Sequence, residues 1–593
     1  MSSTNKNSIP DITLLGHPAG LFVLFFTEMW ERFSYYGMRA LLVLFLVSEA
    51  SKGGWSWTSE EAGKLYALYT GLVYVTPIFG GMIADRWLGF RKAVLVGAIL
   101  MTAGHASMAI ETEFFFYMGL TLLILGNGMF KPNVSSIVGG LYPEGSDKKD
   151  GAYTIFYMGI NAGAFLGILL CGYIGEKVGW SYGFGLAGIF MFAGMIQFWF
   201  GQGILGTVGL SPKEQKDNAN VVLPVNTDEH VLDNVENVQK AESNVSSDKG
   251  AIDIRRIVIW ALIAGATAFG LWYFVPMLLP EVDEWVGPVI IGCMVGIIGF
   301  ILTDPKLQGV SKDRVVVVVI LAIFTIFFWW AFEQAGSSMT IFAKNFTERE
   351  LTGSGAEIFK WVNALLTIVP LGVITYVLAM LVRRTMKFYA ISAVALSLSF
   401  AGIWAIAIWM IYREFSADQS EVPASWFGIL NSLFIIIFAP LFSRLWETKF
   451  NPPATVKFAL GLILLGIGFG ILSFGAMEIP TGAEAGVVRV SMIWLVLAYL
   501  LHTLGELVLS PVGLSYVSKL TPGHLLGIIF GVWFGATAVA NYLGGMTASF
   551  IEPISEKVGL SGFFLIFMAI PIAAGFILIL LTPIIKKKMH GIK

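Results

Sequence analysis

The chain has 593 residues, of which 56% are hydrophobic and 13% are charged, and its formal net charge is −2. Soluble domains usually carry about 25% charged residues, so this composition indicates that lipid surrounds most of the chain. No basic tract points to nucleic acid. The two cysteines, Cys171 and Cys293, lie inside apolar runs, which argues against a disulfide framework or a metal site.

The N-terminal third of the chain predicts six membrane helices. Residues 1–17 are polar and lack the basic segment and cleavage site of a secretory signal, so we expect a retained cytoplasmic N-terminus. Crossing a bilayer takes about 20 apolar residues. Suitable runs lie near residues 18–47, 61–85, 91–110, 114–140, 152–175 and 181–205. They predict a six-helix bundle over residues 18–210.

A polar segment at residues 211–255 separates this bundle from the rest of the chain. It is rich in Asp, Glu, Asn, Lys and Ser and has no aromatic residue. Such a segment cannot bury enough apolar surface to fold alone, so we expect a flexible cytoplasmic linker. Ten further apolar runs follow, near 256–280, 285–303, 313–345, 361–382, 387–412, 425–445, 454–475, 490–517, 525–550 and 560–585.

The sequence therefore predicts an all-α polytopic membrane protein with about sixteen spans. Short loops that we assign to the inside are richer in Lys and Arg than those outside, which places both termini in the cytoplasm. The inner turns contain Arg86, Arg91, Lys92, Lys148, Lys149, Arg444, Lys449 and Lys586 to Lys588. The outer turns 111–113, 280–285 and 477–488 contain no Lys or Arg. A bacterial inner membrane is the expected location.

Six helices, a long linker and further helices resemble the two six-helix halves of the major facilitator superfamily. Twelve helices complete that plan, so about four are additional. We expect one inserted hairpin over 256–312 and a C-terminal six-helix bundle over 313–593 that contains a second hairpin at about 361–412. Each hairpin starts and ends on one side and leaves the core topology intact. Alternatively, one of these four segments is an interfacial amphipathic helix.

The first helix carries four ionisable residues, Glu28, Glu31, Arg32 and Arg39, with two tyrosines between them. At about 100° per residue, they fall within one helix face of roughly 140°. Ionisable groups at membrane depth are costly and usually mark a substrate or ion pathway. A structural ion pair between helices is the alternative interpretation.

Four stretches resemble motifs of the proton-dependent oligopeptide transporter family. The first, Glu28-Met-Trp-Glu31-Arg32-Phe-Ser-Tyr35-Tyr36-Gly37, matches the pattern E-x-x-E-R-F-x-Y-Y-G. The others are Gly80–Gly89 with its Asp85-Arg86 pair, Phe156–Gly163 and Gly505–Pro511. The resemblance covers residues 18–205, 313–345 and 425–585. It implies proton-coupled symport of di- and tripeptides into the cell by alternating access, with the proton as coupling ion and no cofactor.

A carrier of varied peptides must bind what all peptides share: an amine, a carboxylate and backbone amides. By resemblance, Arg32 and Lys131 are the candidates for the carboxylate, where an arginine fork and a lysine point charge suit that group. Glu506 is the candidate for the amine. The remaining candidate substrate contacts are Tyr35, Tyr36, Tyr74, Asn161, Trp330, Asn431 and Ser510. Snorkelling of Lys131, interhelical bonding of the asparagines and packing of the tyrosines are the alternatives.

Proton coupling needs carboxylates whose surroundings change between wet and closed states. Glu28 and Glu31 beside Arg32 fit this requirement. We also expect Arg39 and Glu333 to form a salt bridge that closes one side between the halves. At Glu333 the sequence departs from the family that it resembles, because many members read E-Q-Q-G or place the acid one residue later. Ala67 occupies the position of a histidine linked to proton handling in mammalian members, which leaves protonation to carboxylates. His502 lies on the same face as Glu506 and either tunes it or only packs.

Three charged residues of the turn between the second and third helices, Asp85, Arg86 and Arg91, are expected to form a conformational gate together with Lys92. They would clamp helix ends and stabilise the outward-open state without contacting substrate.

Other functions remain open. Transport of nitrate or another metabolite would need no grip for a zwitterion, and drug efflux by antiport would not depend on Arg32. A membrane enzyme or receptor finds no support in a metal cluster, phosphate loop or nucleophile triad. Peptide, protons and lipid are the expected partners, and a single chain is expected to suffice.

Overall fold

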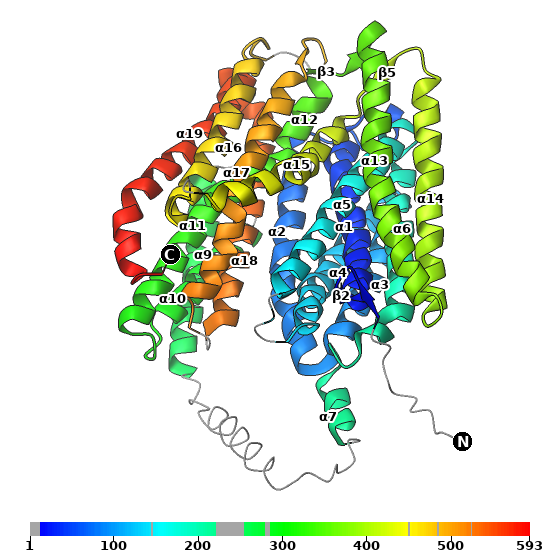
Figure 1. Cartoon of the computed structure of the whole chain (residues 1–593). Coiled ribbons are helices and arrows are strands. Elements are labelled where there is room, and N and C mark those ends of the chain that lie inside the picture. The colour runs from blue at the N-terminus through cyan, green and yellow to red at the C-terminus, as the bar shows by residue number, and fades with distance from the viewer. Residues whose placement is uncertain are drawn as a thin grey trace, which may run out of the picture.

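The computed structural model describes residues 12–143, 146, 148–220, 254–278, 285–448, 451–482, 486–522 and 525–592. Eleven residues of the predicted N-terminal segment and residues 221–253 of the predicted linker lie outside this part. So do parts of the predicted outer turns 280–285 and 477–488. Nearly all of the described chain is helical (Figure 1).

Six long helices form the first half of the molecule. They are α1 (Ala19–Val47), α2 (Ser59–Ile83), α3 (Phe90–Met108), α4 (Glu113–Gly140), α5 (Lys148–Lys177) and α6 (Trp180–Gly201). Shorter turns are η1 (Ala50–Lys52), the π-helical η2 (Ala84–Leu88) and η3 (Gln202–Leu205). α1 packs against α5 and α6, and α3 packs against α4. Nine residues near the start of the predicted linker form a polar helix, α7 (Pro212–Asn220).

The second half contains six membrane segments, the first of which is broken. They are α11 (Gly309–Phe332) with η4 (Glu333–Gly336) and α12 (Ser338–Asn345), then α15 (Ile429–Trp446), α16 (Ala454–Ala476), α17 (Ile493–Leu520), α18 (Leu526–Ser549) and α19 (Ile551–Lys588). The short turn η5 (Ala424–Gly428) precedes α15. α16 packs against α17 and α19. α19 is interrupted at Gly559, whose φ is 74°.

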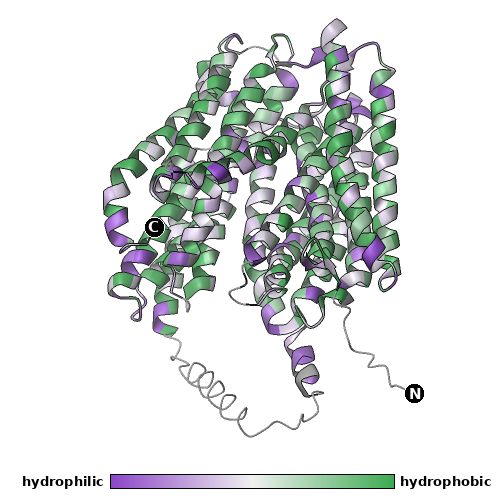
Figure 2. Cartoon of the chain, viewed as in Figure 1, coloured by the Kyte–Doolittle hydropathy of each residue, from purple (hydrophilic) through white to green (hydrophobic). Residues whose placement is uncertain are grey.

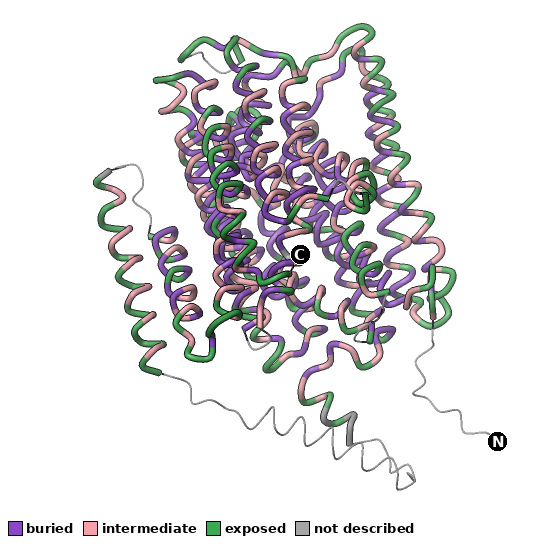
Figure 3. Tube along the Cα trace, turned by 60° about the vertical axis from the view of Figure 1, so that its left-hand side comes forward, coloured by how far each residue is buried: buried purple, intermediate pink, exposed green. Residues whose placement is uncertain are grey.

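Two hairpins complete the fold. The first, α9 (Ile254–Leu278) and α10 (Val286–Leu302), lies beside α18, and no described residue of α9 is buried (Figure 3). The second, α13 (Gly353–Thr385) and α14 (Ala390–Phe415), belongs to the second half by sequence but packs on α6 of the first half (Figure 1). Ser392 donates a hydrogen bond to the carbonyl of Gln197 at 2.7 Å, and Tyr173 donates one to Glu414 at 2.7 Å.

Three short strand pairs lie at the helix ends. β1 (Thr13–Leu14) and β2 (His17–Pro18) form a turn before α1. At the opposite end, β3 (Thr347–Glu348) pairs in parallel with β6 (Val490–Ser491), and β4 (Glu350–Leu351) pairs antiparallel with β5 (Ser420–Glu421). We call the end with β3 to β6 the strand end; it is the upper end in Figure 1.

The predicted all-α polytopic membrane fold is confirmed. Thirteen helices of the described chain are long and apolar enough to cross a membrane. Three further helices correspond to the remaining predicted runs, so that all sixteen runs are helical. They are α1, which has 29 residues and four charges, α3, which has 19 residues, and the shorter α10. Apolar residues dominate the outward faces of the bundle (Figure 2).

The two halves meet along α2 and α18, where small residues let the backbones approach closely. A Cβ on Gly63 would lie 2.7 Å from the Cα of Ser549, and one on Gly545 would lie 2.5 Å from the Cα of Ala67. No larger side chain fits at this crossing. A histidine in place of Ala67 would therefore have to displace α18.

Candidate functional site

The charge cluster of α1 is a closed set of contacts inside the first half. Nε of Arg32 lies 2.7 Å from Oε1 of Glu28 and 2.8 Å from Oε2 of Glu31. The other oxygen of Glu31 accepts a hydrogen bond from Nδ2 of Asn127 on α4 at 2.9 Å. All three charged side chains are almost completely buried. The cation is thus offset by two carboxylates before any substrate arrives.

Lys131 lies one helical turn after Asn127 and faces the same region of the first half. Its Nζ sits 4.2 Å from the ring centroid of Tyr74 on α2, a cation–π contact. Tyr35 packs edge-on against Tyr36 and lies 6.0 Å from the Arg32 guanidinium. The structure therefore gathers the predicted cations and tyrosines of α1, α2 and α4 into one neighbourhood.

A second charge cluster links the two halves. Arg39 on α1 contacts the Glu333 carboxylate at the start of η4, so the predicted ion pair is present. Nε of Arg39 also donates to the hydroxyl of Tyr66 at 2.7 Å, and that hydroxyl donates to Glu333 at 3.3 Å. The absence of a side chain at Gly336 makes room for Tyr66, because a Cβ there would lie 2.0 Å from the Tyr66 hydroxyl.

Among the described residues, the hydrogen-bond partner of Glu506 on α17 is neutral. Nδ2 of Asn431 on α15 donates to Oε2 of Glu506 at 2.8 Å and also contacts Thr503 at 3.2 Å. Asn431 therefore positions the carboxylate without neutralising it. Ser510, one turn further along α17, has a buried hydroxyl oxygen with no partner among the described residues.

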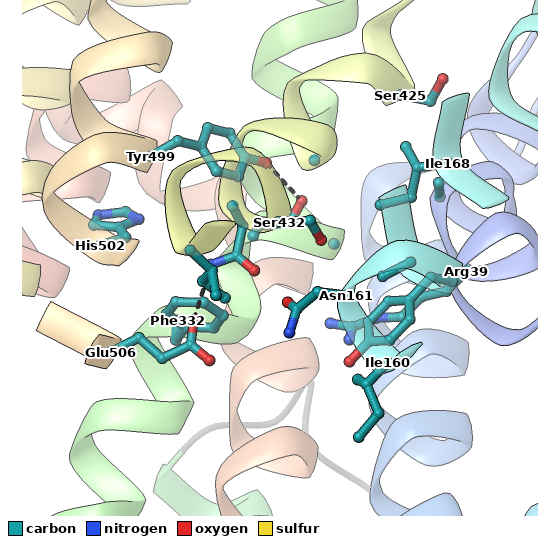
Figure 4. A pocket seen from close by; sticks show the side chains of 18 of the residues that line it. Arg39, Ile160, Asn161, Ile168, Phe332, Ser425, Ser432, Tyr499, His502 and Glu506 are labelled. Carbon is teal, nitrogen blue, oxygen red and sulfur yellow. Dashed lines mark hydrogen bonds between the residues drawn. The ribbon is translucent and has the colours of Figure 1, made fainter. Parts of the chain in front are cut away.

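A cavity of about 210 Å³ lies between the two halves (Figure 4). Glu506 and Asn161 reach toward it from α17 and α5, and Arg39 lies at its side (Figure 4). Its other polar lining includes Tyr36, Tyr157, Asn431, Tyr499 and His502. Isoleucines and Phe332 supply an apolar wall. The space thus combines a carboxylate, amides and hydroxyls with apolar surface.

The structure brings some predicted residues together in this cavity and leaves others outside its lining. Arg39, Tyr36, Asn161, Asn431 and Glu506 line it. The α1 acids, Arg32, Lys131, Tyr35, Tyr74 and Ser510 are not among the lining residues. Trp330 instead donates to Thr547 at 2.9 Å and its ring packs 4.7 Å from that of Phe567, within the second half.

His502 lies beside the cavity but makes no hydrogen bond among the described residues. Both ring nitrogens are buried without a partner, and the ring lies 4.4 Å from that of Phe469. The contact that the structure shows for His502 is therefore ring packing. No group of three metal-binding side chains occurs within the described chain.

The residues predicted to form a gate lie at the end of the bundle opposite the strand end. Asp85 and Arg86 are exposed in η2. Arg91 donates through Nε to the carbonyl of Val208 at 2.5 Å and through its other nitrogen to Gly206, both in the first half. Lys92 pairs at 2.7 Å with Glu214 of α7. This contact and bonds from Ser211 lower the pKa of Glu214 to about 2.

Sequence reasoning missed several contacts that hold the halves together at the strand end. The Glu176 carboxylate of α5 accepts the backbone N–H groups of Ala424 and Ser425, each at 2.8 Å, and so caps η5. Its neighbour Lys177 contacts Glu421, which Arg349 also meets at 3.0 Å. In the sequence, these charged residues lie near helix ends, where charges are common, so nothing indicates that they connect the two halves. Tyr157, which lies inside the motif Phe156–Gly163, and Tyr66 have no pattern in the sequence that singles them out as site residues.

Comparison with known proteins assigns the chain to a family. The sequence model of the POT family matches residues 91–265 and 403–564. The chain is 33% identical to the "Uncharacterized transporter YclF" of Bacillus subtilis, over 99% of this chain and 98% of that protein. It is 30% identical to the "Peptide transporter YePEPT" of Yersinia enterocolitica, over 98% of this chain and 97% of that protein.

Solved structures agree with this assignment. A mutant of a POT peptide transporter in complex with alafosfalin superposes with a TM-score of 0.68 at 30% identity, over 98% of both chains. A POT family transporter in complex with 5-aminolevulinic acid gives the same TM-score at 25% identity, over 97% of this chain and 99% of that one. The sequence match, the relatives and the shared fold lead to one conclusion: the chain belongs to the POT family.

Proposed function

We propose that this protein imports di- and tripeptides together with protons, by alternating access, across a bacterial inner membrane. The observation that carries the proposal is the composition of the central cavity. A carboxylate and an amide of the second half, Glu506 and Asn431, share it with an amide of the first half, Asn161. The family membership and the names of its peptide-transporting relatives support the same function.

A peptide is a zwitterion, and the site offers a different group to each of its parts. Glu506 takes the amine, because the hydrogen bond that it accepts from the neutral Asn431 leaves its charge unmatched among the described residues. The two asparagines bind the peptide backbone. Arg32 and Lys131 attract the carboxylate, and Arg32 uses only Nε to contact the α1 acids. The remaining guanidinium nitrogens suit a carboxylate.

Protons act through the ion pairs. A proton on Glu333 removes the charge that holds Arg39, and the bond between the halves weakens. Arg32 forms two further ion pairs, with Glu28 and Glu31, and protonation of either acid would weaken its pair with Arg32 in the same way. Inward movement of one charge gains about 2.3 kcal/mol per 100 mV of membrane potential, so a proton can drive uphill peptide uptake.

The arrangement of contacts supports an inward-facing state. The described ion pairs between the halves, Arg39–Glu333 and Lys177–Glu421, lie toward the strand end, as do the bonds of Glu176. Lys and Arg favour the opposite end for the cytoplasm. The strand end then faces outward and is closed. Asp85 and Arg86, exposed here, would clamp the inner end when the outer end opens.

Uptake into proteoliposomes tests the proposal. A labelled dipeptide should accumulate when the outside is acidic or the inside is negative, and should equilibrate without either gradient. Indifference of uptake to both gradients would exclude proton coupling while leaving peptide binding intact. Excess unlabelled di- and tripeptides should compete, whereas free amino acids and nitrate should not. Competition by nitrate alone would favour an anion carrier.

A drug efflux antiporter is the functional alternative from another class. Such a protein would not need two oppositely charged groups to bind its substrate, so Arg32→Ala would leave its activity nearly unchanged. Loss of uptake in this variant, with unchanged abundance and elution in detergent, supports the peptide carrier.

A further inference from the structure

A separate cavity of about 470 Å³ lies in the second half, at the end of the bundle opposite the strands. It is bordered by the end of α15, the start of α16 and the ends of α17 and α19. These helix ends belong to the face that we assign to the cytoplasm. No residue of the peptide cavity lines it.

Positive charge collects on the rim of this cavity. Lys457 of α16, Lys519 of α17 and Lys586 of α19 line it, and its described lining contains no Asp or Glu. None of the three forms a salt bridge within the described chain. Three cations that converge on one hollow without a counter-ion favour an anionic ligand.

Aromatic rings hold two of these lysines in place. Nζ of Lys457 lies 4.3 Å from the Trp446 ring centroid, and Nζ of Lys519 lies 5.8 Å from that of Tyr516. Such contacts restrict the side chains and limit the entropy lost on binding. The first turn of α16 also borders the cavity, and no side chain caps its N-terminus. The positive end of the α16 dipole adds to the potential.

The wall of the cavity changes from charged to apolar along α17. Lys519 lies near the end of the helix, Tyr516 one turn deeper, and Val512 and Val508 one and two turns deeper again. A small free anion would need only the lysines of the rim for binding and would make no use of the apolar wall. A rim of cations above an apolar wall fits a molecule with an anionic head and a hydrocarbon tail.

We propose that this cavity binds an anionic phospholipid of the cytoplasmic leaflet, with the phosphate at Lys457, Lys519 and Lys586 and an acyl chain along Val512 and Val508. Basic pockets between membrane helices at the cytoplasmic surface are suited to such headgroups. The lipid then contacts α17, the helix that carries Glu506.

Native mass spectrometry of the full-length protein in detergent tests this site. The probe is phosphatidylglycerol, titrated against the unchanged protein and against a Lys457→Gln, Lys519→Gln, Lys586→Gln variant. The matched control is Lys213→Gln, Lys312→Gln, Lys587→Gln, which removes the same charge from residues outside the cavity lining. Phosphatidylcholine, inorganic phosphate and glycerol phosphate form the other arms. Elution as a single peak establishes that each variant is folded.

We expect the first phosphatidylglycerol to bind the cavity variant about tenfold or more weakly, since each lysine near a membrane surface contributes measurably to attraction of anionic lipid. The control variant should bind it like the unchanged protein, and phosphatidylcholine should bind poorly to all three. Equal weakening in both variants would show general surface attraction and overturn the site. Competition by inorganic phosphate or glycerol phosphate would show an anion site instead of a lipid site.

Discussion

The two charged ends of the proposed peptide site are built differently. At the α1 end, the Arg32 cation is enclosed by Glu28 and Glu31, and an amide from Asn127 completes the set. At the α17 end, Glu506 accepts a hydrogen bond from Asn431 and has no cationic partner within the described part of the chain. One end is compensated within the protein, and the other carries its charge alone.

This difference suggests a division of labour. A buried charge without a partner is costly, so Glu506 gains most from a ligand that brings an opposite charge, either a substrate amine or a proton. Without a bound substrate, the α1 end has little electrostatic cost, because its cation and its two acids neutralise one another. A substrate carboxylate there must compete with the two acids for Arg32, and protonation of either acid favours the substrate.

The largest expected effect follows removal of the lone charge. In Glu506→Gln, uptake of a free dipeptide should fall roughly 10- to 100-fold, the value of a hydrogen bond to a charged group. Binding of an N-acetylated dipeptide should change little, because it has no amine to lose. Counterflow and competition assays in proteoliposomes measure both. An identical loss for both ligands would contradict the assignment of the amine to Glu506.

Arg32→Lys tests the compensated end and should cost less. Lysine keeps the charge but loses both the Nε that contacts the two acids and the planar pair of nitrogens proposed for the substrate carboxylate, so we expect uptake to fall about tenfold. Recovery at lower external pH is expected, since protonation of an acid frees the remaining cation. A pH profile unchanged in shape would contradict a coupled role for this cluster.

The two amides that serve the carboxylates allow a matched comparison. Asn431→Ala removes the bond to Glu506, and we expect free dipeptide to bind about fivefold more weakly, as for a single hydrogen bond of about 1 kcal/mol. Asn127→Ala removes the bond to Glu31, away from the cavity lining, and should shift the pH dependence more than the affinity. The reverse pattern would show that the two ends have exchanged roles.

The smallest effect is expected for an ion pair outside the membrane. Because Lys92 and Ser211 lower the pKa of Glu214 to about 2, its stabilising contribution is present above the ordinary value of 4.5 and is lost progressively as pH falls from there to about 2. Glu214→Gln should therefore leave the pH dependence of uptake unchanged between about pH 5 and 8. A shifted profile would place proton sensing at α7.

The sequence was sufficient to predict the helices, the α1 cluster and the Arg39–Glu333 contact. Apolar runs fix spanning helices by length, and charges at membrane depth must find partners. The position of the second hairpin was not predictable, because α13 and α14 are apolar on many faces and either half would accept them. Contacts such as Glu176 with the N–H groups of η5 depend on the backbone of a distant turn, which residue types do not reveal.

The residues around the cavity were only partly predictable from the sequence. Asn161, Asn431 and Glu506 were expected to share a site, and the structure places them around one space. Trp330 has the residue type of a cavity wall but faces Phe567 and Thr547. Residue type does not reveal which neighbours a helix face meets, and Trp330 lies where α11 packs against α18 and α19.

The most direct test of the two unequal ends is a comparison of three ligands: a dipeptide, its N-acetyl form and its C-terminal amide. Their inhibition constants are measured on the unchanged protein, Glu506→Gln and Arg32→Lys. We predict that Glu506→Gln removes only the preference for a free amine, and that Arg32→Lys reduces only the preference for a free carboxylate. Equal weakening of all three ligands in both variants would contradict a two-ended zwitterion site.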